Sequence, residues 1–228
     1  MAKFSRLRVL NSIIQEGVMP IFYHPQKEVV INVIQACLDG GASCFEFTNR
    51  GDGAYDVFRP VIEHFREEPR LILGAGTILD PATAAMYIQA GVNFIVGPTL
   101  NPEIARLCNR RKIAYIPGCG NTNDISQAEE FGMEICKVFP GGSLGGPGFI
   151  KNVLGPMPWS SLLPTGGVEV TEESVSAWIK AGAVGVGIGS NLFRKDAIEK
   201  MNFQQISNDV KNMLKWVATA RNGMDPVK

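Results

Sequence analysis

The stretch LILGAGTILDPATAAMYIQAGVNFIVGPTLNPEIARLCNRRKIAYIP, residues 71–117, decides the fold. Short apolar runs alternate in it with segments that carry the start and stop signals of helices. Asp80-Pro81 and Asn101-Pro102 each place an N-cap residue before a proline at the first helical position, and Gly91 stands where the first of these helices ends. This order of strand, helix, strand, helix and strand predicts parallel strands joined by helices.

The same alternation extends over the rest of the chain. Thr171 precedes two glutamates, which is another helix start, and glycines such as Gly41, Gly132 and Gly182 follow other helical segments. Residues 203–217 carry apolar side chains at three- and four-residue steps, which predicts a long amphipathic last helix. The predicted strands are residues 18–23, 43–48, 71–75, 93–97, 113–117, 133–139, 160–165 and 183–188.

Eight strand–helix units within 228 residues predict one α/β domain over residues 1–228, folded as a single (β/α)8 TIM barrel with an extra N-terminal helix over residues 4–15. An open doubly wound sheet is the competing fold, and it often has a glycine-rich turn after its first strand. Here the first strand ends in Tyr23-His24-Pro25, without glycine. The late Gly185-Val186-Gly187-Ile188-Gly189 does not match GxGxxG, so the barrel is favoured.

Composition excludes several classes of protein. The 22 basic and 22 acidic residues balance, which gives no electrostatic reason to expect nucleic acid or an anionic membrane as partner. No apolar run reaches the roughly 18 residues of a membrane-spanning helix, and residues 1–10 lack the apolar stretch of a secretory signal. The five cysteines form no CxxC pair and the chain has only two histidines, His24 and His64, so we expect a cytoplasmic protein without a metal site.

The second predicted strand carries a carboxylate where a core residue is expected. Side chains alternate along a strand, so Glu46 and Thr48 share the face opposite to Phe45 and Phe47. The two phenylalanines suit contact with the surrounding helices, which turns Glu46 into the barrel. A carboxylate there loses its water and needs compensation. Glu46 is therefore either half of a structural ion pair or a functional group.

The sixth predicted strand, residues 133–139, carries Lys137 inside an apolar run, although lysine is almost never fully buried without a partner. An ion pair with Glu46 is again the structural interpretation. A buried lysine also favours its neutral amine, which can attack a ketone, and a neighbouring carboxylate can transfer protons. The pair is thus a candidate for amine-dependent catalysis.

The last two predicted strands run into glycine-containing turns, Pro164-Thr165-Gly166-Gly167-Val168 and Gly187-Ile188-Gly189-Ser190-Asn191. Backbone N–H groups can converge at such turns. Barrels frequently hold a phosphate after their seventh and eighth strands. The two turns together predict a phosphate site, and His24, just after the first strand, is a further candidate for the mouth of the barrel.

Seven short motifs follow one another along the chain: E-x-T-x-R at 46–50, G-A-G-T at 74–77, a proline at 98, P-G at 117–118, K-x-F-P at 137–140, P-T-G-G-V at 164–168 and G-x-G-S at 187–190. With these motifs the chain resembles, over residues 18–193, the class I 2-keto-3-deoxy-6-phosphogluconate (KDPG) and 4-hydroxy-2-oxoglutarate (KHG) aldolase family. The sequence departs from the family pattern at Asn49, at residues 96–99 and 119–124, and at Gly141, all at the expected mouth of the barrel.

This resemblance implies a Schiff-base aldolase that cleaves 2-dehydro-3-deoxy-6-phosphogluconate reversibly to pyruvate and glyceraldehyde 3-phosphate. It also implies a homotrimer that uses no metal or other cofactor. Lys137 is implied as the Schiff-base lysine and Glu46 as the general acid and base. The residues implied in substrate binding are Arg50 and Thr77 for the carboxylate of pyruvate, Pro98 and Phe139 for the pyruvyl group, Thr165 for the choice of substrate, and Gly166, Gly167, Gly189 and Ser190 for the phosphate.

Three alternatives stay open on the residues alone. The first is a relative that cleaves 4-hydroxy-2-oxoglutarate or the phosphogalactonate epimer of the substrate. The second is a phosphosugar isomerase or epimerase, which would leave Lys137 without a task. The third is a barrel that only binds phosphorylated metabolites, in which Lys137 and Glu46 would form a structural pair.

Overall fold

A computed structural model describes residues 2–222 and has an α/β fold in which each strand pair is parallel. The eight predicted strands are all present, although most are shorter than the apolar runs that predict them. The strands are β1 (Val18–Phe22), β2 (Cys44–Thr48), β3 (Ile72–Gly76), β4 (Phe94–Val96), β5 (Ala114–Ile116), β6 (Gly118–Cys119), β7 (Cys136–Val138), β8 (Leu162–Pro164) and β9 (Val186–Ile188).

The strands form two curved sheets, ordered β5-β4-β3-β2-β1-β9 and β6-β7-β8. At one side, Pro117 alone separates β5 from β6, and its carbonyl accepts a hydrogen bond from the Lys137 N–H at 2.9 Å. At the other side, Thr165 and Gly187 form an isolated parallel bridge between the segments of β8 and β9. The strand predicted over 113–117 is thus interrupted, because proline has no N–H to donate to the ladder.

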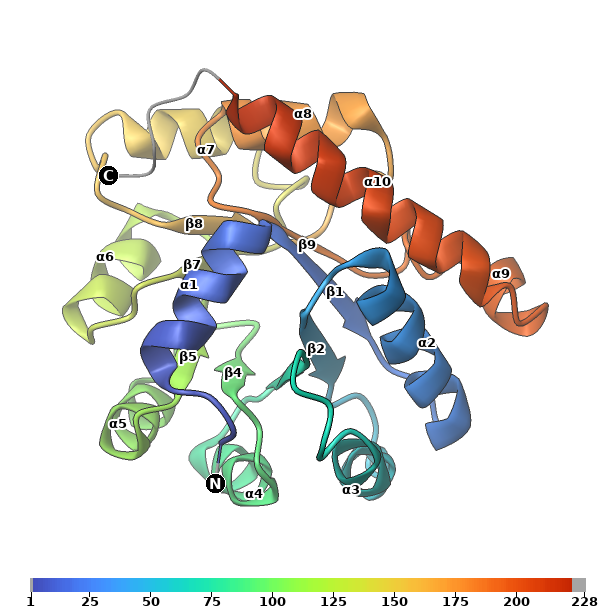
Figure 1. Cartoon of the computed structure of the whole chain (residues 1–228). Coiled ribbons are helices and arrows are strands. Elements are labelled where there is room, and N and C mark those ends of the chain that lie inside the picture. Colours follow the sequence, from blue (N-terminus) through green and yellow to red (C-terminus); the bar gives the residue numbers. More distant parts are fainter. Residues whose placement is uncertain (1, 223–228) are drawn as a thin grey trace.

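The helices begin where the sequence predicts. The side chains of Asp80, Asn101 and Thr171 accept hydrogen bonds from the first-turn N–H groups of their helices. In Figure 1 the helices lie around the outside of the strands. They are α1 (Arg6–Glu16), α2 (Lys27–Gly40), α3 (Ala54–His64), α4 (Pro81–Ala90), α5 (Pro102–Arg111), α6 (Thr122–Glu130), α7 (Pro147–Leu154), α8 (Glu172–Lys180), α9 (Lys195–Glu199) and α10 (Phe203–Arg221).

The leading helix α1 differs from the others, because it lies in front of the strands and inside the ring of outer helices (Figure 1). Its apolar residues Val9, Leu10 and Ile13 belong to a buried cluster with strand residues such as Ile72 and Leu163. The carboxylate of Glu16 at its end accepts hydrogen bonds from the N–H groups that open β2. Helix α1 therefore covers the amino-terminal ends of the strands and leaves their carboxyl ends free.

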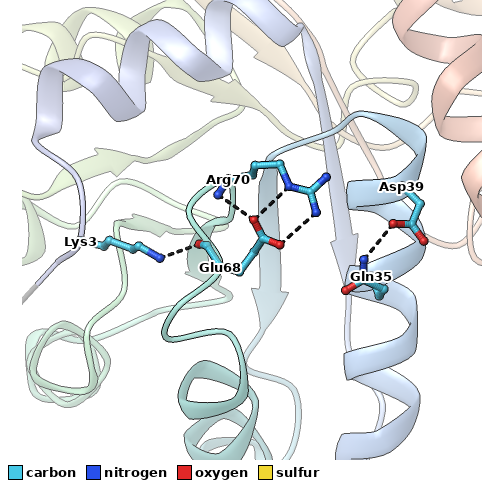
Figure 2. A network of polar contacts seen from close by, with 5 residues as sticks. All are labelled: Lys3, Gln35, Asp39, Glu68 and Arg70. Carbon is cyan, nitrogen blue, oxygen red and sulfur yellow. Dashed lines mark hydrogen bonds and ion pairs between the residues drawn. The ribbon is translucent and has the colours of Figure 1, made fainter.

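Polar contacts hold the segment before α1 at the same end (Figure 2). Lys3 Nζ donates hydrogen bonds to the carbonyl of Arg66 at 3.0 Å and to that of Glu68 at 2.5 Å. Hydrogen bonds from the Arg70 side chain, more than any other influence, hold the pKa of the Glu68 carboxyl down to about 2. This exposed network ties the chain start to the loop that precedes β3.

The outer core lies between the strands and the surrounding helices. The last helix α10 has the predicted apolar face, with Ile206, Val210 and Met213 fully buried, and it packs against α2 and α8. Met133 and Ile135 are equally buried although they lie outside β7. An apolar run thus predicts which residues are buried. Where a strand begins and ends depends instead on which backbone groups form hydrogen bonds with a neighbouring strand.

Candidate active site

A cavity of about 400 Å³ opens at the carboxyl ends of the strands, at the end that α1 does not cover. Residues from β1, β2, β7 and the segments that follow β3, β4, β8 and β9 line it. Ten of the eleven predicted site residues meet there: Glu46, Arg50, Thr77, Pro98, Lys137, Phe139, Thr165, Gly166, Gly189 and Ser190.

Lys137 and Glu46 form a buried ion pair in this cavity. Lys137 Nζ lies 3.7 Å from Glu46 Oε2, and the two side chains are 8% and 1% exposed. Register explains why they face inward: Glu46 pairs with Gly74 of β3, and Lys137 pairs with Gly118 of β6 and Leu163 of β8. The amine can therefore meet a ligand in the cavity with a carboxylate beside it.

The carboxyl of Glu46 is placed to exchange protons. Burial is the largest influence and raises its pKa, while the nearby Lys137 cation and, after it, the charge of Arg50 lower it. Glu46 Oε2 is also a buried atom without a hydrogen-bond partner among the described residues. A ligand hydroxyl or a water molecule in the cavity would satisfy this oxygen.

Next to the amine lies a wall of mixed character. The ring centre of Phe139 is 5.4 Å from Lys137 Nζ, and Pro98 lies on the same cavity. Arg50 follows β2 and is exposed, which leaves its guanidinium free for an anionic ligand. Thr77 follows β3 with a φ of 59°, a left-handed conformation that a β-branched residue rarely adopts and that clusters at functional sites.

The turns after β8 and β9 supply free hydrogen-bond donors. Gly166 and Gly167 have φ angles of 84° and 81°, so the first turn needs glycine at both positions. The N–H groups of Gly167 and Ser190 donate no hydrogen bond to another described residue. The side-chain oxygen of Thr165, Oγ1, is buried and has no hydrogen-bond partner within residues 2–222. Such a set of donors can hold an oxyanion.

Two predicted residues lie outside the lining. Gly167 is exposed and absent from the lining, and a Cβ built on it would lie 2.6 Å from the Cα of Gly142 in the loop after β7. His24 stacks on Phe22 with ring centres 6.3 Å apart, and its Nδ1 accepts a hydrogen bond from the Gln26 N–H. His24 thus serves the turn that leads into α2.

Thr48 lines the cavity on the inward face that the sequence predicts for it, whereas sequence reasoning missed four other lining residues: Ile21, Phe22, Tyr23 and Phe193. The rings of Phe22 and Phe193 meet with centres 4.9 Å apart although the residues are far apart in sequence. The aromatic pair Phe22-Tyr23 at the end of the first strand was the available signal, since strand ends carry the site in this fold. Phe193 had no signal, because its place depends on the turn after β9.

The described residues hold no group of three or more His, Cys, Asp or Glu side chains that could bind a metal ion. Within the same residues, no helix has the length and apolar character needed to cross a membrane.

A buried amine beside a buried carboxylate, at the carboxyl ends of parallel strands and next to free backbone donors, defines an α/β enzyme suited to an anionic carbonyl compound. Comparison with known families assigns it further. The model of the KDPG and KHG aldolase family matches residues 9–208, so the chain belongs to this family and is an aldolase, a carbon–carbon lyase.

Relatives resemble the chain over most of its length. The 2-dehydro-3-deoxy-phosphogluconate aldolase of Haemophilus influenzae is 25% identical over an alignment that covers 92% of this chain and 97% of that protein. The KHG/KDPG aldolase of Escherichia coli K12 is 28% identical, with coverage of 86% and 91%. The structure of KDPG aldolase from Legionella pneumophila, with pyruvate captured as a covalent carbinolamine, has a TM-score of 0.79 at 23% identity and coverage of 89% and 97%. This last likeness supports the fold.

Proposed function

We propose that the chain is a class I aldolase that cleaves 2-dehydro-3-deoxy-6-phosphogluconate reversibly to pyruvate and glyceraldehyde 3-phosphate. The observation that carries the proposal is the placement of Lys137 Nζ, buried 3.7 Å from Glu46 Oε2 and open to a cavity with free amide donors. The names of the relatives from H. influenzae and E. coli agree with this activity.

The reaction begins when the neutral amine of Lys137 attacks the C2 ketone and forms a carbinolamine. Proton transfer through Glu46 lets this intermediate lose water and become an iminium ion joined to Lys137. The iminium withdraws electrons from the neighbouring carbon–carbon bond. The burial that raises the pKa of Glu46 favours the protonated carboxyl, which suits a group that must donate a proton in this step.

Cleavage follows from the same pair. Glu46 takes the proton of the C4 hydroxyl, the C3–C4 bond breaks, and its electrons move into the iminium to give an enamine. Glyceraldehyde 3-phosphate leaves as the carbonyl product. Protonation of the enamine at C3 and hydrolysis of the resulting iminium release pyruvate and restore the Lys137 amine.

The other lining residues hold the substrate along the cavity. Arg50 and Thr77 bind the carboxylate of the pyruvyl group, and Pro98 and Phe139 pack on its carbon atoms. Binding energy from the phosphate end aligns the C3–C4 bond. Thr165, Gly166, Gly167, Gly189 and Ser190 serve that end, and their free donors and the orphaned Thr165 hydroxyl support this assignment.

We further propose one domain over residues 1–228 whose two sheets close into a (β/α)8 barrel, with α1 as the extra helix. The single proline between β5 and β6 and the bridge between Thr165 and Gly187 support closure. A homotrimer and catalysis without a metal are proposed from the family. A cytoplasmic location is proposed because all five cysteines are free and buried.

Two measurements test the activity. The first compares kcat/KM for the phosphogluconate, phosphogalactonate and hydroxyoxoglutarate substrates, and we expect the first to be preferred. A strong preference for the unphosphorylated substrate would instead establish the KHG activity. The cavity lining allows it, because Arg50 and Lys137 are the only cationic side chains that residues 2–222 contribute to it.

The second measurement uses Lys137→Arg, which keeps a cation beside Glu46 but supplies no neutral amine. We expect this variant to lose turnover on all three substrates while a protein with its fold intact is recovered. Turnover near the wild-type rate would exclude Schiff-base catalysis and return the isomerase alternative.

A further inference from the structure

Gly76, the last residue of β3, lies against the carboxylate of Glu46. Strand register pairs Gly76 with Thr48 and Gly74 with Glu46. A Cβ atom built on Gly76 would overlap Oε1 and Cδ of Glu46 and lie 2.7 Å from its Cγ. Gly76 does not have a positive φ, so the backbone does not require glycine here. Glycine is needed at position 76 because the Glu46 carboxylate fills the space that a side chain would take, and not because of the backbone conformation.

We propose that Gly76 is a positioning residue for the aldolase reaction: its missing side chain lets the Glu46 carboxylate rest against β3 within reach of Lys137 Nζ. This inference rests on the proposed function. Glu46 is only 1% exposed but lines the cavity, so a carboxylate that is pushed away from β3 turns within this cavity and leaves its place beside Lys137. An alanine at position 76 occupies the place of Oε1, so the oxygen that faces Lys137 moves as well.

The effect falls on catalysis more than on folding. The atoms that the new methyl group meets are the end of one side chain, and that end can turn away while the strand keeps its ladder. Displacement of a reacting group by about 1 Å can cost about 10²-fold in rate. We therefore expect Gly76→Ala to lower kcat by about 10²-fold, with a small change in KM, because Arg50 and Thr77 are untouched.

Gly74 supplies a matched control on the same strand. A Cβ built on Gly74 would overlap the ring of Phe94, which belongs to the buried interior cluster, and its three nearest contacts are all atoms of this ring. Gly74→Ala therefore disturbs the packing around Phe94, while the Glu46 carboxylate keeps its place. We expect it to lower the thermal midpoint at least as much as Gly76→Ala does, while kcat stays near the wild-type value.

A shorter acid gives the decisive test. Glu46→Asp withdraws the carboxylate by one methylene, which lowers kcat in the wild-type background but relieves the overlap when position 76 carries a methyl group. We expect Glu46→Asp to lower kcat in the wild-type background but to raise it in the Gly76→Ala background, so that Gly76→Ala/Glu46→Asp has a higher kcat than Gly76→Ala. The inference is overturned if Gly76→Ala keeps near wild-type kcat, or if Glu46→Asp lowers kcat by the same factor in both backgrounds. A wild-type protein that releases no pyruvate refutes the proposed function instead.

Discussion

Removing the amine of the Lys137–Glu46 pair is expected to destabilise the protein. In Lys137→Met the buried carboxylate loses the cation 3.7 Å away, while methionine keeps much of the aliphatic volume. At an effective dielectric constant of about 20, two unit charges at 3.7 Å attract each other by about 4.5 kcal/mol. Breaking a buried pair from one side costs about 3–5 kcal/mol. Both values indicate a loss of about 4 kcal/mol in the free energy of unfolding near pH 8.

The loss depends on pH in a defined direction. Burial already raises the pKa of Glu46, and removing Lys137 takes away the cation that lowers this pKa most strongly. A carboxyl with a higher pKa in the folded than in the unfolded state binds more protons when folded. Its contribution to stability is complete below the unfolded pKa and is lost as pH rises through the folded pKa. Lys137→Met should thus lose more stability at about pH 8 than at about pH 4.5.

Urea unfolding followed by circular dichroism at the two pH values measures this effect. The control is Lys137→Met/Glu46→Gln, which removes the unpaired charge as well and should recover most of the loss at the higher pH. An equal loss at both pH values, or a double variant no more stable than Lys137→Met, would refute a buried and charged Glu46.

Two further variants test the amino-terminal and the carboxyl ends of the strands. Ile13→Ala, in the helix that covers the amino-terminal ends, should lower the free energy of unfolding by about 2–5 kcal/mol, whereas Leu7→Ala on its exposed side should change it by less than about 0.5 kcal/mol; equal losses in urea unfolding would contradict the covering role of α1. Ser190→Ala removes the side-chain hydroxyl and keeps the backbone N–H. The loss of a hydrogen bond from this hydroxyl to the charged phosphate should raise KM about 10-fold for a phosphorylated substrate. Steady-state kinetics that show the same rise for 4-hydroxy-2-oxoglutarate would contradict a phosphate site there.

The parallel α/β arrangement was predictable from the sequence because its signals are local. Asp80-Pro81 and Asn101-Pro102 open α4 and α5 as their capping chemistry predicts. The alternation of Glu46 with Phe45 and Phe47 correctly placed the carboxylate on the inward face. Strand ends were less predictable, since the apolar run over 133–139 is buried over its length but forms a ladder only at 136–138.

Other parts of the site depend on contacts between distant segments, which periodicity does not encode. The motif G-A-G-T was recognisable, but the overlap of a side chain at Gly76 with Glu46 is visible only once β2 and β3 are paired. The same holds for Phe193 and Phe22, and for the packing of Gly167 on the loop at Gly142. Sequence named the groups that carry the chemistry, whereas the structure shows the neighbours that position them.

In the proposed mechanism the buried amine of Lys137 becomes covalently joined to a keto acid. This bond can be trapped by incubating the protein with pyruvate and sodium borohydride, followed by digestion and mass mapping of the peptides. We expect one reduced pyruvyl adduct, on the peptide that contains Lys137, and none in Lys137→Arg. An adduct on a different lysine, or no adduct under conditions in which the enzyme releases pyruvate, would contradict it.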